Sequence, residues 1–305
     1  MRQVRNLLKR RVEQALSSSV AGAITRHRIR GKRLILAYHG IVPEGATPAG
    51  ERALFIAQRE FAGHLEVLAS IADVAPLDRI DEPGDGRPRV AITFDDAYRG
   101  AVNEGVSELA MRRLPATIFV APGRLNGHVF WWDALSHQSL TLNERVRLHA
   151  LYALGGSDER VRAWAARTQL ASTDALPAYA QTANHAELRD ALTNPGITVG
   201  SHSWSHANLT SLGAPEITAE VELPRDWLRK EFGNKAIPWL AYPYGLESEE
   251  TRRAAFTASY SGALRIGGGW HRPSDVSAFA RPRLSIPGNI SLAGFRARLL
   301  GAMPT

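Results

Sequence analysis

The apolar residues of this chain fall into short runs that alternate with segments of helical spacing. Residues 89–94 and 116–120 have the apolar character and the length of buried strands. Segments 61–71 and 101–113 repeat their apolar side chains at the spacing of helices. Strands that alternate with helices are typical of a parallel sheet with crossover connections, so the pattern predicts an α/β fold.

A helix-rich stretch interrupts this alternation at residues 140–192. Its spacing predicts three helices, over residues 143–154, 159–170 and 185–192. We interpret the stretch as an insertion or lid between two strands, within one domain that spans residues 34–305. The length is consistent with a single large domain, because α/β barrels routinely exceed the usual domain size.

The amino-terminal residues differ from the rest of the chain in charge. Residues 1–33 contain ten Lys or Arg and one acidic residue, whereas the remainder contains 27 basic and 29 acidic residues. The formal charge of +7 therefore belongs to this tail, which argues against nucleic-acid binding by the folded domain. Helical spacing in the tail predicts a basic amphipathic helix, which either lies on an anionic membrane surface or packs on the domain.

Composition bears on the compartment and on the kinds of site available. A hydrophobic share of 44% and a charged share of 22% are ordinary for a globular protein. We find neither the continuous apolar core of a secretory signal nor a stretch long enough to span a bilayer. We therefore expect a cytoplasmic protein, with peripheral contact at the inner face of the membrane if the tail binds lipid. The absence of cysteine excludes disulfides and thiolate metal ligands.

Two short segments about a hundred residues apart carry the candidate chemistry. Asp95 and Asp96 follow one strand-like run, and His202 and His206 follow another at 197–200. Carboxylates and imidazoles bind zinc and similar divalent ions, and a catalytic site keeps one position open for water. Two histidines four residues apart share one face if they lie on a helical turn. Adjacent aspartates alternate faces on a strand, so at its end they can divide the roles of metal ligand and proton acceptor.

These segments resemble the first two motifs of the polysaccharide deacetylases, the carbohydrate esterases of family four with a NodB-homology domain. The matching sequences are Thr93-Phe94-Asp95-Asp96 and His202-Ser203-Trp204-Ser205-His206, followed in order by a third motif, Leu240-Ala241-Tyr242-Pro243-Tyr244-Gly245. The resemblance covers roughly residues 34 to 290. It implies a distorted (β/α) barrel of the polysaccharide deacetylase type, here with a helical insertion.

The resemblance also implies a role for each matching residue. Asp95 takes the place of the general base. The main-chain N–H of Tyr244 takes the place of an oxyanion donor, and Pro243 and Tyr244 are expected beside the sugar. The metal ligands of the family correspond to Asp96, His202 and His206. Zinc is the default from ligand type, and cobalt, iron or nickel fit the same set.

Two departures from the family pattern concern the surroundings of the base and the identity of the acid. Where the third motif usually carries an Arg, this chain has Ala241. The usual Leu-x-x-His near the carboxyl terminus, whose His is the general acid, is absent after His206, but Leu36-x-x-His39 occurs near the amino terminus. This order resembles the circularly permuted branch of poly-N-acetylglucosamine deacetylases, and it implies His39 as the general acid.

Four further residues are expected to complete the site. Arg283 starts an apolar run and is a candidate to replace the missing Arg, and Asp275 is a candidate to orient the general acid. Surface exposure is the alternative for both charged residues. Trp204 and Trp270 lie close to the motifs and are expected as walls of the sugar site. The aromatic stretch 130–133 also suits a sugar ring and its hydroxyls, but packing of the insertion on the barrel is the favoured assignment.

The sequence therefore predicts a metal-dependent hydrolase that acts on carbon–nitrogen bonds other than peptide bonds. Its expected reaction removes an N-acyl group, above all N-acetyl, from an amino sugar in a polysaccharide or glycolipid precursor, for example in exopolysaccharide biosynthesis. The expected partner is an N-acetylated amino-sugar polymer or a lipid-linked glycan. Two alternatives stay open: a deacetylase or deformylase of a lipid- or nucleotide-linked sugar, and a non-catalytic carbohydrate-binding barrel. A ligand set accompanied by a free carboxylate favours catalysis over binding alone.

Overall fold

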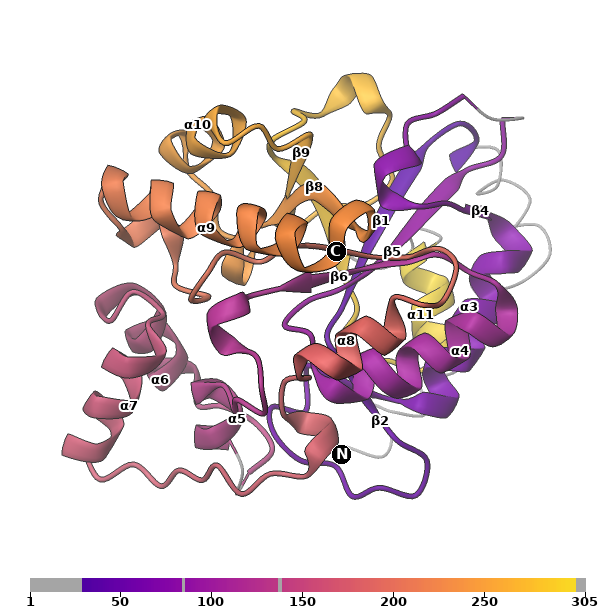
Figure 1. The fold of residues 1–305 in the computed structure, drawn as a ribbon. Coiled ribbons are helices and arrows are strands. Elements are labelled where there is room, and N and C mark those ends of the chain that lie inside the picture. The colour runs from indigo at the N-terminus through magenta and orange to yellow at the C-terminus, as the bar shows by residue number, and fades with distance from the viewer. Residues whose placement is uncertain (1–28, 84–85, 137–138, 300–305) are drawn as a thin grey trace.

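Seven parallel strands close into a barrel in the computed structural model (Figure 1). They are β1 (Arg33–Tyr38), β5 (Arg89–Phe94), β6 (Ala116–Val120), β7 (Ile197–Ser201), β8 (Ala236–Ala241), β9 (Gly262–Ile266) and β10 (Arg281–Ser285). Their order around the barrel is β1–β10–β9–β8–β7–β6–β5, and β5 pairs with β1 to close the ring. The expected α/β barrel is confirmed.

The structure describes residues 29–83, 86–136 and 139–299. The amphipathic helix predicted within residues 1–33 lies almost wholly outside the described residues, so its position is not assigned. Among the described helices, none combines the length and the apolar character needed to cross a lipid bilayer.

The strands are buried on both faces, as expected for a parallel barrel covered by helices. All six residues of β1 pair in register with β5, from Arg33 opposite Arg89 to Tyr38 opposite Phe94. Inward-facing side chains from around the barrel form one apolar cluster, which includes Ile35, Ala91, Phe119, Trp239 and Leu264. A larger cluster joins the outward faces to the surrounding helices. A short strand, β4 (Asp73–Val74), pairs with Arg89 and Val90 at the start of β5.

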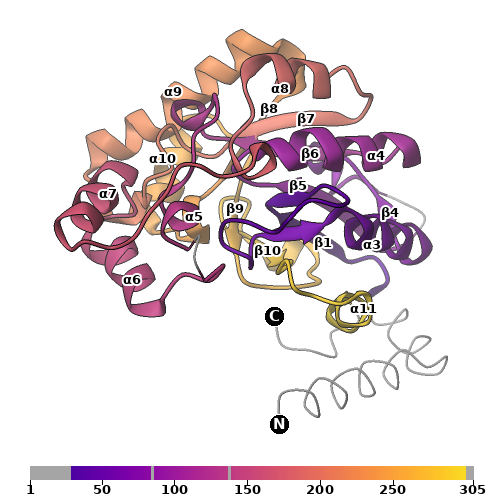
Figure 2. The ribbon, with the colours of Figure 1, turned by 90° about the horizontal axis from the view of Figure 1, so that it is seen from below.

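Helices surround the barrel, as seen from below in Figure 2. They are α3 (Gln58–Ile71), α4 (Val106–Arg112), α8 (His185–Ala191), α9 (Ala214–Phe232), α10 (Glu249–Thr257) and α11 (Leu292–Leu299). A π-helical turn, Ala101–Gly105, precedes α4. The helices expected over residues 61–71, 101–113 and 185–192 are therefore confirmed.

Three further helices lie together at one end of the barrel (Figure 1). They are α5 (Trp131–Ser136), α6 (Glu144–Leu148), which continues as a π-helical turn to Ala153, and α7 (Asp158–Arg167). They pack in an apolar cluster that includes Phe130, Leu142 and Val161 and that extends to Tyr98 and Tyr179 outside these helices. Leu188 of α8 belongs instead to the main cluster. We call α5–α7 the helical layer; it begins at Trp131, earlier than the expected boundary at 140, and ends before α8.

The chain turns sharply after β1 into a second, two-stranded parallel sheet of β2 (Gly40–Val42) and β3 (Phe55–Ala57). Only glycine fits at the start of β2, because a Cβ on Gly40 would lie 2.2 Å from the ring of Phe55. The turn leaves His39 at the carboxyl end of β1. The carboxyl ends of the parallel strands all open toward the same mouth of the barrel, where α/β barrels build their sites.

Candidate metal centre and active site

The carboxyl end of β5 carries Asp95 and Asp96 into the mouth of the barrel. Asp95 still follows the strand, because its main-chain N–H donates to the Tyr38 carbonyl oxygen at 2.9 Å. Asp96 and Ala97 then adopt left-handed backbone conformations, with φ of 68° and 49°. Such conformations are uncommon for residues other than glycine and gather at functional sites. The turn brings both carboxylates to one cavity, although on a regular strand they would face opposite ways.

Asp96, His202 and His206 form a buried cluster with the spacing of a metal site. Asp96 Oδ1 lies 3.1 Å from His206 Nε2 and 3.6 Å from His202 Nε2. One ligand atom from each residue can be chosen so that all three lie within 4.8 Å of one another. Asp96 Oδ1 is buried without a hydrogen-bond partner among the described residues. A buried carboxylate oxygen without a partner is costly, so this donor set fits a divalent cation.

The two histidines reach the cluster from a loop and not from a helical turn. The main-chain N–H of His202 donates to the Val120 carbonyl oxygen at 2.8 Å, directly after β7. Ser203 and His206 have φ of 61° and 60°. The Ser203 hydroxyl accepts a hydrogen bond from the main-chain N–H of His206 at 3.0 Å. These left-handed residues coil the loop tightly enough to bring both rings to Asp96.

Hydrogen bonding and burial favour the neutral, cation-binding form of both imidazoles. His202 Nδ1 lies 2.7 Å from the carbonyl oxygen of Ala241, so it donates there and leaves Nε2 free. Burial lowers the pKa of His202 and lowers the pKa of His206 to about 4. Burial also raises the pKa of Asp96, to about 6. Position 241 takes part through its main chain, a contact that does not depend on the family's usual Arg.

Arg283 on β10 forms a buried ion pair with Asp95. Its Nη1 lies 2.7 Å from Asp95 Oδ1 and its Nη2 lies 2.8 Å from Oδ2, while Nη1 also donates to the Thr93 hydroxyl at 3.2 Å. The Arg283 side chain is 0% exposed. Burial alone would raise the pKa of Asp95, but the charge and hydrogen bonds of Arg283 hold that pKa well below its usual range. The structure thus brings Arg283 to the carboxylate that it was predicted to support.

His39 lies on the other side of Asp95, at the end of β1. Its Nε2 is 4.0 Å from Asp95 Oδ2, and its side chain is 16% exposed. The ring lines the same cavity as the Asp96 cluster. Burial lowers the pKa of His39, although the neighbouring carboxylates of Asp95 and Asp96 act in the opposite direction. Among the described histidines outside the cluster, only His39 reaches both Asp95 and the cavity.

Tyr244 lies in a tight 3₁₀ turn, Pro243–Gly245, directly after β8. Its φ of 59° is left-handed, and its ring meets the ring of His206 edge-on with centroids 4.7 Å apart. The hydroxyl donates to the Gly156 carbonyl oxygen at 2.8 Å and accepts from Trp131 Nε1 at 3.2 Å. No acceptor for the Tyr244 main-chain N–H is found among the described residues. The turn thus leaves a free donor beside the cluster.

A cavity of about 310 Å³ opens on these residues. The helical layer supplies one of its walls through Trp131, Trp132, Arg147 and Leu151. The Trp132 ring lies 5.0 Å from the ring of His206, centroid to centroid. The aromatic stretch that was assigned to packing therefore also faces the site.

Trp270 and Asp275 lie at the opposite end of the barrel. His271 pairs with Arg33 at the start of β1, whereas His39 follows the end of that strand. Trp270 donates from Nε1 to the Leu299 carbonyl oxygen at 2.7 Å and packs against the outer core. Asp275 is exposed, and its carboxylate accepts from the main-chain N–H of Arg272 at 3.3 Å. Neither residue reaches the cavity, so Asp275 does not orient His39 in this structure.

Trp204 and Pro243 lie near the site but do not line it. The Trp204 indole lies against Gly123, where a Cβ would stand 3.0 Å from Nε1. Its main-chain N–H donates to Glu220 at 2.9 Å. Pro243 is buried within the turn that presents Tyr244. Trp204 and Pro243 are close in sequence to the site residues, but left-handed residues turn both loops. Sequence position therefore did not predict which of these side chains line the cavity.

The cavity wall rests on a buried network that the sequence did not reveal. Trp132 Nε1 donates to the Tyr98 hydroxyl at 2.9 Å, and that hydroxyl donates in turn to Asp133 Oδ2. Asp133 Oδ1 accepts from the main-chain N–H of Glu51 at 2.7 Å. Burial raises the pKa of Asp133 to about 7. Asp133, at the end of the aromatic stretch, was visible in the sequence, but its partners Tyr98 and Glu51 lie 35 and 82 residues away along the chain.

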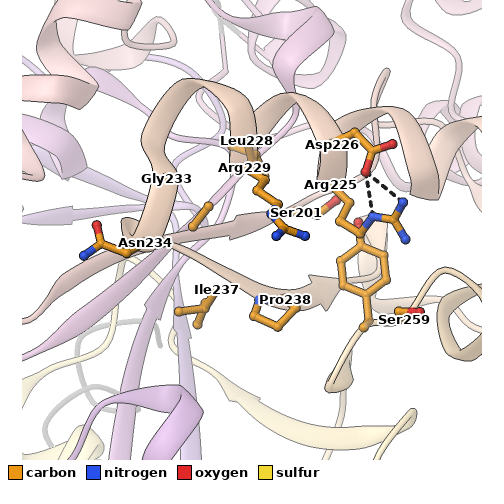
Figure 3. Close-up of a pocket in the computed structure, with 12 residues that line it drawn as sticks. Ser201, Arg225, Asp226, Leu228, Arg229, Gly233, Asn234, Ile237, Pro238 and Ser259 are labelled. Atoms are coloured by element: carbon orange, nitrogen blue, oxygen red, sulfur yellow. Dashed lines mark hydrogen bonds and ion pairs between the residues drawn. The ribbon is translucent and has the colours of Figure 1, made fainter.

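A larger cavity, of about 740 Å³, lies outside the barrel between the end of α9 and β8 (Figure 3). Arg225 and Asp226 at its rim form an ion pair at 2.7 Å. In the part of the chain that the structure describes, its lining residues include no histidine and no second carboxylate. It therefore lacks the groups that make the smaller cavity a candidate for hydrolytic chemistry.

Fold and site together define a class of protein: a parallel (β/α) barrel with a buried Asp–His–His cluster and an Arg-paired carboxylate at the carboxyl ends of its strands. Residues 83–263 match the family model described as polysaccharide deacetylase, and the chain belongs to this family.

Solved structures confirm the fold. IcaB from Ammonifex degensii aligns with a TM-score of 0.62 at 16% identity, over 88% of this chain and 97% of that one. The Streptococcus pyogenes deacetylase PplD, in complex with acetate, aligns with a TM-score of 0.60 at 16% identity, over 88% and 99%. The deacetylase domain of BpsB from Bordetella bronchiseptica aligns with a TM-score of 0.54 at 14% identity, over 84% and 96%.

One curated relative, an uncharacterized 30.6 kDa protein of Geobacillus stearothermophilus, is 32% identical over 60 residues. The match spans 20% of this chain and 23% of that protein, less than a quarter of the relative's length.

Proposed function

We propose that this chain is a metal-dependent hydrolase that removes an N-acyl group, above all N-acetyl, from an amino sugar of a polysaccharide or related glycan. One observation carries the proposal: the Asp96–His202–His206 cluster shares a cavity with Asp95, which Arg283 holds at 2.7 and 2.8 Å. A cation site alone would serve binding. Hydrolysis also requires a carboxylate that is ionised and lies outside the ligand set.

Asp96, His202 and His206 would hold the metal, which when bound supplies an activated water and polarises the acyl carbonyl. Asp95 is the neighbouring proton acceptor, with Oδ2 4.0 Å from His202 Nε2. Because Arg283 holds the pKa of Asp95 far below neutrality, the carboxylate is ionised throughout the physiological range. The two bonds from Arg283 also fix the direction of the carboxylate, as general base catalysis requires.

His39 is the proposed general acid. It faces Asp95 from β1 and lines the cavity, so in its protonated form it can donate to the leaving amine as the carbon–nitrogen bond breaks. We further propose that this first strand fills the place usual for the last, as in the circularly permuted branch of the family. The free main-chain N–H of Tyr244 is the proposed oxyanion donor. Loss of one such donor typically lowers kcat by about 10²–10³.

Family membership and the deacetylases among the structural neighbours support this reaction. The position of Arg283 weighs against a non-catalytic carbohydrate-binding barrel, because the missing Arg at position 241 was the reason to consider one. A barrel that only bound sugar would gain nothing from an arginine buried against a second, non-ligand carboxylate.

Acetate release from N-acetylglucosamine oligomers tests the proposal. Protein stripped by chelator should release no acetate, and added zinc or cobalt should restore release. Asp96→Asn and His202→Ala should lose bound metal and activity together, while Asp78→Asn, an exposed carboxylate elsewhere, should keep both. The proposal fails if the ligand variants retain full metal content and full activity, or if no divalent metal supports release.

A further inference from the structure

One charged side chain of the cavity wall has no part in the proposed chemistry. Arg147 lies on α6 of the helical layer and lines the cavity together with Leu151, one helical turn further on. Its side chain is 37% exposed, so it is neither buried in the core nor free in solvent. The other arginine at this site, Arg283, is fully buried and engaged by Asp95.

A buried carboxylate fixes Arg147 in place. The Glu51 side chain is 2% exposed, and its Oε2 lies 3.0 Å from Arg147 Nη2. The same oxygen accepts from the main-chain N–H of Leu142 at 2.6 Å, and Oε1 accepts from that of Ala53 at 3.3 Å. Main-chain donors therefore satisfy much of the Glu51 charge. Arg147 is thus anchored by one nitrogen while the rest of its guanidinium stays available.

The remaining donors of Arg147 have no hydrogen-bond partner among the described residues. A guanidinium carries five N–H donors, and its planar fork matches the two oxygens of a carboxylate or a phosphate. Glu144, the other nearby carboxylate, lies 3.9 Å from Arg147 Nε, beyond hydrogen-bond distance, and its side chain is 74% exposed. Arg147 is therefore an anchored cation at a cavity whose carboxylates are already engaged in the proposed reaction.

From this placement we infer that Arg147 binds an anionic group of the substrate, a carboxylate or a phosphate carried beside the N-acyl amino sugar. The inference rests on the proposed function, because it takes the cavity to be the deacetylation site. It adds a charge requirement: acidic glycans or phosphate-linked sugars are preferred over neutral oligomers of the same size. Arg147 is a specificity-determining residue here and takes no part in bond breaking.

Three probes separate the sources of negative charge. Neutral N-acetylglucosamine oligomers carry none, hyaluronan oligosaccharides carry a carboxylate on the adjoining sugar, and UDP-N-acetylglucosamine carries phosphates. Acetate release is measured with each for the wild type, Arg147→Gln and Arg147→Lys. Arg145→Gln is the matched control, because Arg145 is an exposed arginine of the same helix outside the cavity lining.

The wild type should favour one acidic probe over the neutral oligomer by tenfold or more in kcat/KM, and added salt should reduce that preference. Arg147→Gln should abolish the preference through KM, Arg147→Lys should retain part of it, and Arg145→Gln should behave as wild type. The inference is overturned if the wild type shows no preference, or if Arg147→Gln weakens all three probes equally.

Binding measurements keep the two proposals separate. If the neutral oligomer is deacetylated without any preference for charge, the function stands and the inference fails. If no probe releases acetate with any divalent metal, the proposed function fails. Calorimetric binding of the same probes to wild type and Arg147→Gln then decides the inference: selective loss of acidic-probe binding supports it, and equal binding overturns it.

Discussion

Replacing Arg283 by Met tests whether the buried ion pair holds Asp95 in its working state. Met keeps much of the apolar volume but removes both bonds to Asp95, at 2.7 and 2.8 Å, and the bond to Thr93. Arg283 is 0% exposed and Asp95 is 3% exposed, so water cannot readily replace the lost donors. Removing one partner of a buried ion pair typically costs about 3–5 kcal/mol, which sets the expected loss in unfolding free energy.

The size of this loss should depend on pH. In the wild type, Arg283 holds the folded pKa of Asp95 below its ordinary value of 3.8, so the pair contributes stability above about pH 4 that is lost as the pH falls through the folded pKa. Without Arg283, burial still acts to raise the folded pKa of Asp95, and we expect this pKa to lie above the unfolded value. The variant then takes up a proton on folding, and its deficit should widen between pH 5 and pH 7.

Urea unfolding of metal-free protein at both pH values measures this deficit, and acetate release measures the effect on turnover. We expect a tenfold or greater loss of kcat in Arg283→Met, because the base is misaligned and partly protonated. The double variant Asp95→Asn/Arg283→Met removes both charges and should be more stable than Arg283→Met alone. Additive stability losses, or unchanged turnover in Arg283→Met, would refute this role for the pair.

Three other substitutions test features around the site and in the core. Burial lowers the pKa of His64 from 6.5 to about 3, so as the pH falls the unfolded protein takes up this proton at a higher pH than the folded protein does. His64→Phe should therefore reduce the stability lost between pH 7 and pH 5 by about 2 kcal/mol, as checked by urea unfolding. Asp133→Ala leaves the buried Tyr98 hydroxyl and the Glu51 main-chain N–H without an acceptor, which should lower the free energy of unfolding by about 1–3 kcal/mol for each donor. The same change should raise KM by freeing Trp132, while metal content stays unchanged. Gly156→Ala places a Cβ 2.6 Å from the ring of Tyr244 at a φ of +62°, so both melting temperature and kcat should fall; an unaffected kcat would separate Tyr244 from the reaction.

The barrel and the central residues were predictable because strand ends in a parallel barrel share one mouth. Asp95, His202 and His39 each follow a strand-like run, and closure of β1 onto β5 and β10 brings them together. Arg283 was predictable as a replacement because it begins an apolar run, although its sequence separation of 188 residues from Asp95 gave no local signal. Strand position therefore carried most of the usable information.

The remaining parts of the site depend on the directions that loops take. Left-handed residues such as Ser203 and His206 shape the loop that carries the two histidines, and single-sequence spacing cannot reveal them. Trp270 and Asp275 follow β9 in sequence, but they lie near the start of β1, at the end of the barrel opposite the cavity. The pairing of His271 with Arg33 marks this position. Long-range packing also decides the cavity wall, where the helical layer supplies aromatic side chains that were expected to pack the insertion on the barrel.

The central claim is that Asp96, His202 and His206 hold the metal on which N-deacetylation depends. Bound zinc and acetate release should be measured on the same samples of wild type and Asp96→Asn across a zinc titration. The account predicts that release rises with occupancy to a plateau at one metal per cluster, and that Asp96→Asn loses both together. Full acetate release by metal-free protein, or an Asp96→Asn variant with undiminished zinc and activity, would contradict it.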